Sequence, residues 1–146
     1  MPISGLALHS VGNHTVGHPS LAEIGEEQVI EELAGLERNF NEKFRKKMLF
    51  MRPPKGEYNE NVLKIARKMK YCTLFWSFAY DDWDVKKIRG KEYPIQKVTE
   101  NLHNGAVLLL HAVSKDNAEG LEGIISNARS KGYEFGNPEE LCRGIQ

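Results

Sequence analysis

Short apolar runs alternate with segments of helical periodicity along this chain, and this alternation restricts its fold more than any other feature. Apolar, β-prone runs are expected as strands at residues 48–51, 72–78, 106–110 and 133–135. Between them, apolar residues recur every three or four positions, which predicts helices around residues 20–40, 62–69, 95–102 and 116–128. Strands that alternate with helices usually form a parallel sheet covered by those helices. The sequence therefore predicts an α/β fold with mainly parallel strands.

Polar residues and one glycine mark the expected helix ends. Ser20 with Glu23, and Asp116 with Glu119, match the pattern of a side-chain cap at a helix N-terminus. Gly132 follows the last helical segment and predicts its C-terminus, because glycine adopts the left-handed backbone of that position without strain.

Composition is ordinary for one globular domain, which we expect to cover residues 1–146. The 146 residues are 40% hydrophobic, and 20 basic side chains balance 20 acidic ones, so nothing indicates nucleic acid as a partner. The longest apolar run, 106–110, is too short to span a membrane, and no signal peptide is recognisable. Cys72 and Cys142 lack C-x-x-C spacing and are expected as free thiols, although a disulfide stays open.

Residues with catalytic chemistry fall where the expected strands end. In parallel α/β folds the active site gathers at these strand ends. His14, Arg52, Asp82 and His111 all occupy such positions. The sequence therefore predicts that these four residues include the functional ones.

His14 and His18 are four residues apart, so one turn of chain can direct both imidazoles at one ion. Zinc prefers imidazole nitrogen, and two histidines with a carboxylate form a common catalytic set. The alternative is a polar capping region that also uses Thr15 and Ser20.

The other candidates also have two interpretations each. Prolines after Arg52 fix the backbone and can aim the Lys55 amide at an oxyanion, or the segment is a plain turn. Asp82, beside Trp83, can orient a catalytic histidine, or it belongs to an acidic turn. His111 ends the most apolar run and suits a general acid, or it is a core-edge histidine bonded to the backbone.

Four segments in this order resemble the polysaccharide deacetylase family, also called NodB-homology proteins or family 4 carbohydrate esterases. The sequence NHTVGH resembles the family motif H-[ST]-x-x-H, RPPKG resembles R-x-P-x-G, DDW resembles D-W, and LLLH resembles L-x-x-H. The segments FWSFAYDDW and LLLHAVSKDNAEGL look most like the muramic-acid deacetylases, which prepare peptidoglycan for its δ-lactam form. The resemblance implies a partial (β/α) barrel-like domain.

The resemblance implies a zinc-dependent hydrolase that removes N-acetyl groups from the amino sugars of a glycan such as peptidoglycan. It assigns His14 and His18 to the metal and His111, Asp82 and Arg52 to catalysis. Substrate binding is implied for four further residues, Pro54, Lys55, Trp83 and Leu108.

One family motif is missing. The T-F-D-D-G segment supplies the catalytic base and the third metal ligand, but this chain has no aspartate before Asp81. We therefore expect that the first strands are absent, that zinc is held weakly and that activity is impaired. The alternative is an inactive remnant or a glycan-binding protein with the same fold. Sheet edges left open by the missing strands predict a homo-oligomer. Family members usually act outside the cell, whereas the lack of a signal peptide leaves the cytoplasm open.

Overall fold

The computed structural model describes residues 9–143, and their contacts divide them into two compact units. The first unit ends at Phe75 and the second begins at Trp76. This division does not test the expectation of one domain over residues 1–146, which stays a prediction.

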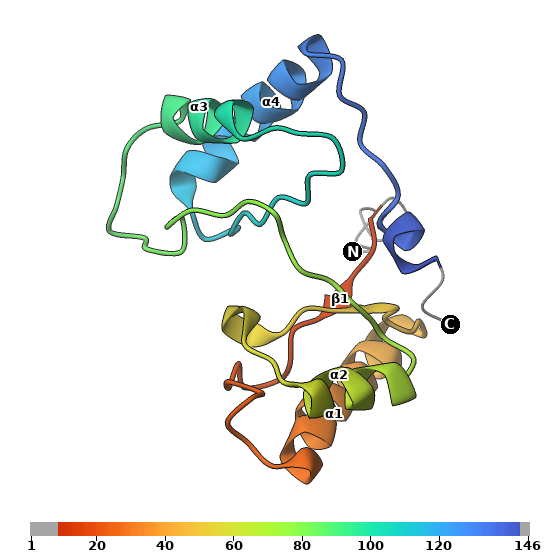
Figure 1. Ribbon diagram of the computed structural model, residues 1–146. Helices are drawn as coiled ribbons and strands as arrows, with labels where there is room; N and C mark the ends of the chain where they lie inside the picture. Colours follow the sequence, from red (N-terminus) through yellow and green to blue (C-terminus); the bar gives the residue numbers. More distant parts are fainter. Residues whose placement is uncertain (1–8, 144–146) are drawn as a thin grey trace. The chain divides into compact units, whose positions relative to one another are not determined.

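The first unit is a small parallel sheet with two helices. Its strands are β1 (Gly12–Asn13), β2 (Phe50–Met51) and β3 (Cys72–Thr73), and they pair in the order β1-β2-β3. Both pairs are parallel, so the predicted α/β class with parallel strands is confirmed. Helix α1 (Glu26–Phe44) and helix α2 (Glu60–Lys68) connect the strands and lie side by side, while the short η2 (Pro54–Gly56) follows β2 (Figure 1).

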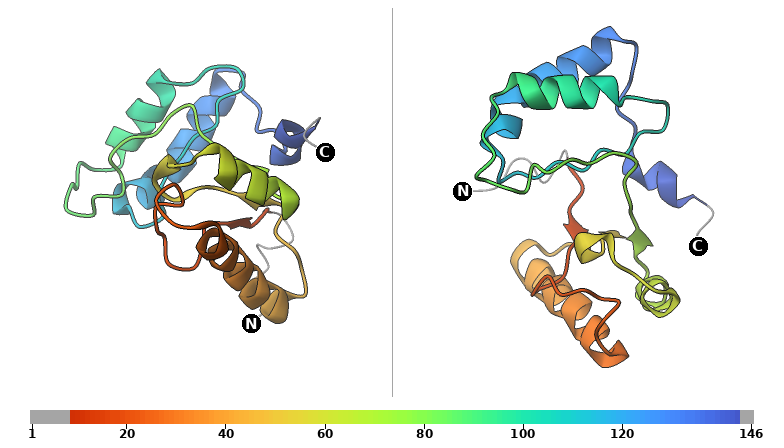
Figure 2. Two further views of the ribbon diagram at one scale, coloured as in Figure 1. Left: turned by 60° about the horizontal axis from the view of Figure 1, so that its bottom comes forward. Right: turned by 60° about the vertical axis from the view of Figure 1, so that its left-hand side comes forward.

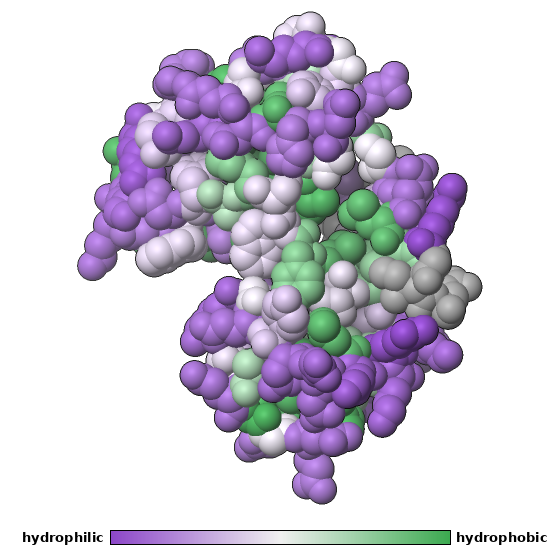
Figure 3. All heavy atoms as spheres, in the orientation of Figure 1, coloured by the Kyte–Doolittle hydropathy of each residue, from purple (hydrophilic) through white to green (hydrophobic). Residues whose placement is uncertain are grey.

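Apolar side chains of the helices and strands form the core of the first unit. Leu33 of α1 is completely buried, and it belongs to one cluster with Met51 of β2 and Ile65 of α2. Burial of such side chains is the main stabilising contribution, at roughly 1.5–3 kcal/mol each. Hydrophilic side chains cover most of the visible outer surface (Figure 3).

The second unit contains a helical pair. Helix α3 (Glu92–Glu100) packs beside α4 (Lys115–Ser130) in every view, and η3 (Pro138–Cys142) follows (Figure 2). The expected strand at 106–110 makes one parallel bridge, between Phe78 and Leu108. Residues 72–78 form a strand only at 72–73, and 133–135 form none in the described part of the chain. These strand predictions were too long because backbone hydrogen bonds to a neighbouring strand end after one or two residues.

Two helix starts differ from the sequence prediction. Helix α1 begins at Glu26, where the Gln28 side chain accepts a hydrogen bond from the Gly25 amide (3.3 Å). Ser20 instead accepts the Glu23 amide in a turn. Helix α4 is capped by Ser114, whose hydroxyl accepts the Asn117 amide at 3.2 Å.

Asp116 lies inside the first turn of α4, and there it accepts the Arg89 amide at 2.7 Å. At the other end the prediction is confirmed. Gly132 has φ +85°, and the Tyr133 amide donates to the Ala128 carbonyl, which closes the helix.

Gly120 sets the approach of α4 to α3. A Cβ atom at this position would lie 2.8 Å from the Lys91 carbonyl oxygen and 3.1 Å from Cγ of Pro94. We expect Gly120→Ala to lower the melting temperature, since overpacking costs about 1–3 kcal/mol, against about 1 kcal/mol of helix propensity gained. Thermal unfolding followed by circular dichroism measures this.

Gly123→Ala is the matched control on the same helix. Its Cβ would meet only the end of the flexible Ile95 side chain, which can rotate away. A larger loss of stability in Gly123→Ala than in Gly120→Ala would contradict the argument.

The structure also corrects the expectation for the two cysteines. Neither Cys72 nor Cys142 is a free thiol, so the expectation of free thiols is wrong. None of the helices within residues 9–143 is long and apolar enough to cross a membrane.

Candidate active-site residues

His14 and Arg52 meet at the carboxyl edge of the small sheet, because each directly follows a strand of one parallel pair. The Arg52 amide donates to the Asn13 carbonyl at 2.9 Å, which extends the ladder by one bond. Nδ1 of His14 lies 2.6 Å from the Arg52 carbonyl oxygen. A carbonyl can only accept, so Nδ1 carries the proton and Nε2 carries the lone pair that a metal would require.

The loop from Asn13 to His18 is held by short hydrogen bonds from two directions. Within it, the His18 amide donates to the Thr15 hydroxyl at 3.0 Å. From α1, one carboxylate oxygen of Glu32 accepts the amides of Val16 (2.9 Å) and Gly17 (2.7 Å). Thr15 and His18 adopt positive φ angles of 70° and 57°. Such conformations are strained for residues with a Cβ, so the bonds around them fix the loop.

Asn13 anchors this loop from inside the unit, although no sequence pattern distinguishes it. It is 1% exposed, its Oδ1 accepts the Thr15 amide at 2.9 Å, and its amide donates to the Leu33 carbonyl at 2.8 Å. The same amide lies 3.0 Å from the hydroxyl of Tyr71, which in turn donates to Glu37 at 2.8 Å. Burial, followed by the hydrogen bond to Glu37, raises the pKa of Tyr71 to about 12, so this hydroxyl remains a donor at neutral pH.

The imidazoles of His14 and His18 lie together, with ring centroids 4.8 Å apart and ring planes at 80°. This arrangement suits two ligands of one ion. Among residues 9–143, however, no group of three or more histidine, cysteine, aspartate or glutamate side chains could hold a metal. The donors found in this range therefore fit half of a zinc shell, without the third protein ligand of a catalytic site.

The segment after Arg52 forms a tight turn around Lys55. Pro53 and Pro54 are buried, and Lys55 and Gly56 both have positive φ angles, 59° and 72°. The amides of Gly56 and Glu57 donate back to the two proline carbonyls at 3.1 Å. Burial lowers the pKa of the Arg52 guanidinium. The expected aim of the Lys55 amide at an oxyanion stays a prediction.

Asp82 and His111 form an acid–base pair in the second unit. Oδ1 of Asp82 lies 2.7 Å from Nδ1 of His111, and Oδ2 accepts the His111 backbone amide at 2.6 Å. The Asp82 side chain has no exposed surface, whereas the His111 side chain is 31% exposed. An ionised carboxylate can only accept, so His111 donates through Nδ1 and its Nε2 is the nitrogen available to a reactant.

Asn117 and Tyr80 extend this pair, and neither is among the predicted site residues. Nδ2 of Asn117 donates to Oδ2 of Asp82 at 2.6 Å, and the Tyr80 hydroxyl donates to Oδ1 of Asn117. Asn117 lies 35 positions after Asp82 in the sequence, so no local pattern predicts their hydrogen bond.

The two residues expected to line an acetyl pocket have different surroundings. Leu108 is half-buried and bridges to Phe78, whereas Trp83 is 62% exposed. Trp83 lies in a loop closed by Arg89, whose guanidinium bonds both oxygens of Asp81 at 2.7 Å. Arg89 and then Lys87 hold the pKa of Asp81 well below its usual value. The substrate roles of Pro54, Lys55, Trp83 and Leu108 stay predictions.

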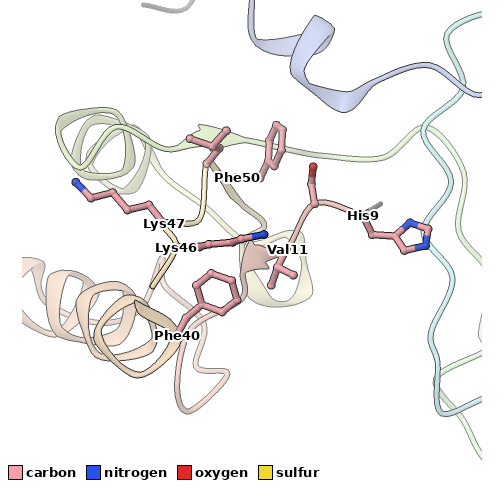
Figure 4. Close-up of a pocket in the computed structure, with 8 residues that line it drawn as sticks. His9, Val11, Phe40, Lys46, Lys47 and Phe50 are labelled. Atoms are coloured by element: carbon pink, nitrogen blue, oxygen red, sulfur yellow. The ribbon is translucent and has the colours of Figure 1, made fainter. Parts of the chain in front are cut away.

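A pocket of about 160 Å³ lies in the first unit. Phe40 and Val11 point into it, and the His9 ring is directed away (Figure 4). The lining residues are His9, Ser10, Val11, Phe40, Lys46, Lys47, Leu49 and Phe50. None of them is a predicted site residue.

Sequence comparisons point to one family. The model for polysaccharide deacetylase matches residues 6–74. The peptidoglycan-N-acetylmuramic acid deacetylase PdaA of Bacillus subtilis is 37% identical over 134 residues, which are 91% of this chain and 51% of that protein. The chain thus spans about half the length of the curated relatives it matches.

Structural comparisons agree with the sequence. The structure of Bacillus subtilis PdaA, a family 4 carbohydrate esterase, superposes with a TM-score of 0.87 at 34% identity, covering 94% of this chain and 59% of that one. A family 4 pseudoenzyme from Bacillus anthracis gives a TM-score of 0.82 at 27% identity, covering 90% and 45%. A mutant of that pseudoenzyme is described as having restored enzymatic activity.

Proposed function

Because this chain belongs to the polysaccharide deacetylase family, we propose that its chemistry is the N-deacetylation of peptidoglycan sugars. In this reaction water adds to the acetyl carbonyl, the C–N bond breaks, and acetate and a free amino sugar leave. The substrate class follows from the similarity to a deacetylase of N-acetylmuramic acid. A cell-wall location follows from the same substrate.

The observation that carries the proposal is the pair of Asp82 and His111. The amine leaving group needs a proton, and a general acid that supplies it contributes roughly 10²–10⁴-fold to the rate. His111 is held by a buried carboxylate through Nδ1 at 2.7 Å, and its ring is partly exposed. We assign His111 as the acid and Asp82 as the residue that orients it. Arg52 is assigned, from the family resemblance, as the residue that would position a catalytic base.

His14 and His18 are the residues that would hold zinc. When bound, the ion supplies polarisation of the acetyl carbonyl and activation of water. Nε2 of His14 has the lone pair for such a bond, because Nδ1 donates to the Arg52 carbonyl. Two imidazoles without a third protein donor bind zinc weakly, so we propose that the activity of this chain is impaired.

A second candidate function is glycan binding without turnover. It is favoured by the lack of a third ligand among the described residues, and by the lack of an aspartate before Asp81 in the given sequence that could act as base. The similarity to a family 4 pseudoenzyme shows that this fold exists without activity in a relative. We also propose that copies of the chain associate, because within residues 9–143 β1 and β3 each pair with only one strand of the small sheet.

Zinc titration by calorimetry tests the metal role without a guess about the substrate. We expect the purified chain to bind zinc weakly. Each of His14→Ala and His18→Ala removes one ligand, so we expect their zinc affinity to be lower by about tenfold or more. His103→Ala is the control, since His103 is exposed and its ring bonds only the nearby Asn101 carbonyl among described contacts. Equal affinity in all four proteins would exclude the histidine pair as the site.

Acetate release from peptidoglycan, measured with and without zinc, separates the two candidate functions. Zinc-dependent release that is lost in His111→Ala supports the deacetylase. Zinc and glycan binding without acetate release would support the binding protein.

A further inference from the structure

We propose that Asn117 is a positioning residue for the acid: its side-chain amide fixes the Asp82 carboxylate, and Tyr80 fixes that amide. This inference rests on the proposed deacetylase chemistry, because it concerns the aim of His111. It gives a role to two residues outside the four short motifs, although both lie in the longer segments FWSFAYDDW and LLLHAVSKDNAEGL.

The Asp82 carboxylate depends on Asn117 for one of three donors. Oδ1 takes the His111 ring, while Oδ2 takes both the His111 amide and Nδ2 of Asn117, each at 2.6 Å. The carboxylate is fully buried, so water cannot replace a lost donor. Without Asn117 the carboxylate can turn about its bond to Cβ, and the ring that it holds turns with it.

Tyr80 decides which way the Asn117 amide points. Its hydroxyl donates to Oδ1 of Asn117, which leaves Nδ2 directed at Asp82. The reversed amide would place Oδ1 against a carboxylate oxygen, and two acceptors repel each other. Burial, followed by the charges of Asp82 and Asp116, raises the pKa of Tyr80 to about 12, so the hydroxyl stays a donor.

The backbone around His111 is held from both sides by this network. Its amide donates to Asp82, and its carbonyl accepts a second bond from Nδ2 of Asn117 at 3.2 Å. Asn117 itself is fixed at the start of α4, where its amide donates to the Ser114 hydroxyl. Asn117 therefore connects the start of α4 to the backbone of His111 and, through Asp82, to the His111 ring.

Tyr80 is in turn placed by aromatic neighbours. Its ring centroid lies 6.2 Å from that of Phe78 and 5.8 Å from that of Tyr93. These contacts restrict the ring, so its hydroxyl meets Asn117 in one orientation.

The test is an exchange measurement on the His111 ring. In ¹⁵N-histidine-labelled protein, assigned with His111→Gln, we expect the Nδ1 proton to exchange with solvent about tenfold faster or more in Asn117→Ala, as for other lost supporting hydrogen bonds. Tyr80→Phe should shift the rate in the same direction by a smaller factor. Asn127→Ala is the matched control, because this asparagine on the same helix donates only to Thr99 among described contacts, at 3.4 Å.

Each outcome decides the proposal. Faster exchange in Asn117→Ala and Tyr80→Phe, with Asn127→Ala unchanged, supports it. Unchanged exchange in folded Asn117→Ala, even with a lower melting temperature, would show a merely structural role and overturn it. If Asn117→Ala does not fold, Tyr80→Phe alone decides by the same criterion. No substrate or zinc is needed, so failure of the proposed deacetylase activity is detected separately by acetate release.

Discussion

Asn13→Ala is expected to destabilise the first unit by more than about 3 kcal/mol, since each buried group left unpaired costs about 1–3 kcal/mol. Three groups lose a hydrogen bond to Asn13, namely the Thr15 amide, the Leu33 carbonyl and the Tyr71 hydroxyl, and only the hydroxyl keeps another side-chain partner, Glu37. Asn13 is almost fully buried, so water does not reach these groups in the folded chain. Urea unfolding followed by fluorescence measures the loss.

Asn41→Ala is the control for this prediction. Asn41 donates its amide to the Lys46 carbonyl at 3.2 Å in an exposed position, where water replaces the bond. We expect its effect to stay within about 0.5 kcal/mol, as for most surface changes. Similar losses in both variants would refute the anchoring role of Asn13.

Asp82→Asn is expected to lower the rate of acetate release by about 10²–10⁴-fold, the usual contribution of an oriented general acid. Both carboxylate oxygens accept hydrogen bonds, from the His111 ring on one side and from Asn117 on the other. A carboxamide has a single acceptor oxygen, so its NH₂ group must face a donor on one side. The His111 ring then loses its orientation.

Asp84→Asn is the control for Asp82→Asn. Its carboxylate caps the Lys86 amide in an exposed turn and lies 3.8 Å from Lys87, so we expect unchanged turnover. Turnover by Asp82→Asn at the level of the parent chain would refute the assignment of the pair.

The sequence predicted the features that repeat or have fixed spacing. Helical periodicity located α2, α3 and α4, and the apolar run at 48–51 located β2. The proximity of His14 to His18 and of Asp82 to His111 was expected, the first from spacing and the second from family resemblance. In the structure the members of each pair are in contact, whereas their roles stay predictions.

The missed residues share a physical reason. Asn13, Glu32 and Asn117 act through hydrogen bonds to residues 15–35 positions away, and one polar side chain has no periodicity that reveals such a partner. The start of α1 was missed because Ser20 and Glu23 match a cap pattern but form a separate turn. Local patterns cannot distinguish these cases, since long-range packing selects between them.

The paired histidines and the pair of Asp82 and His111 are each held by contacts inside their own unit. The hydrogen bonds described for one pair therefore include no residue of the other pair. Over evolutionary time, selection for folding alone would preserve each pair's supporting bonds after turnover has ceased.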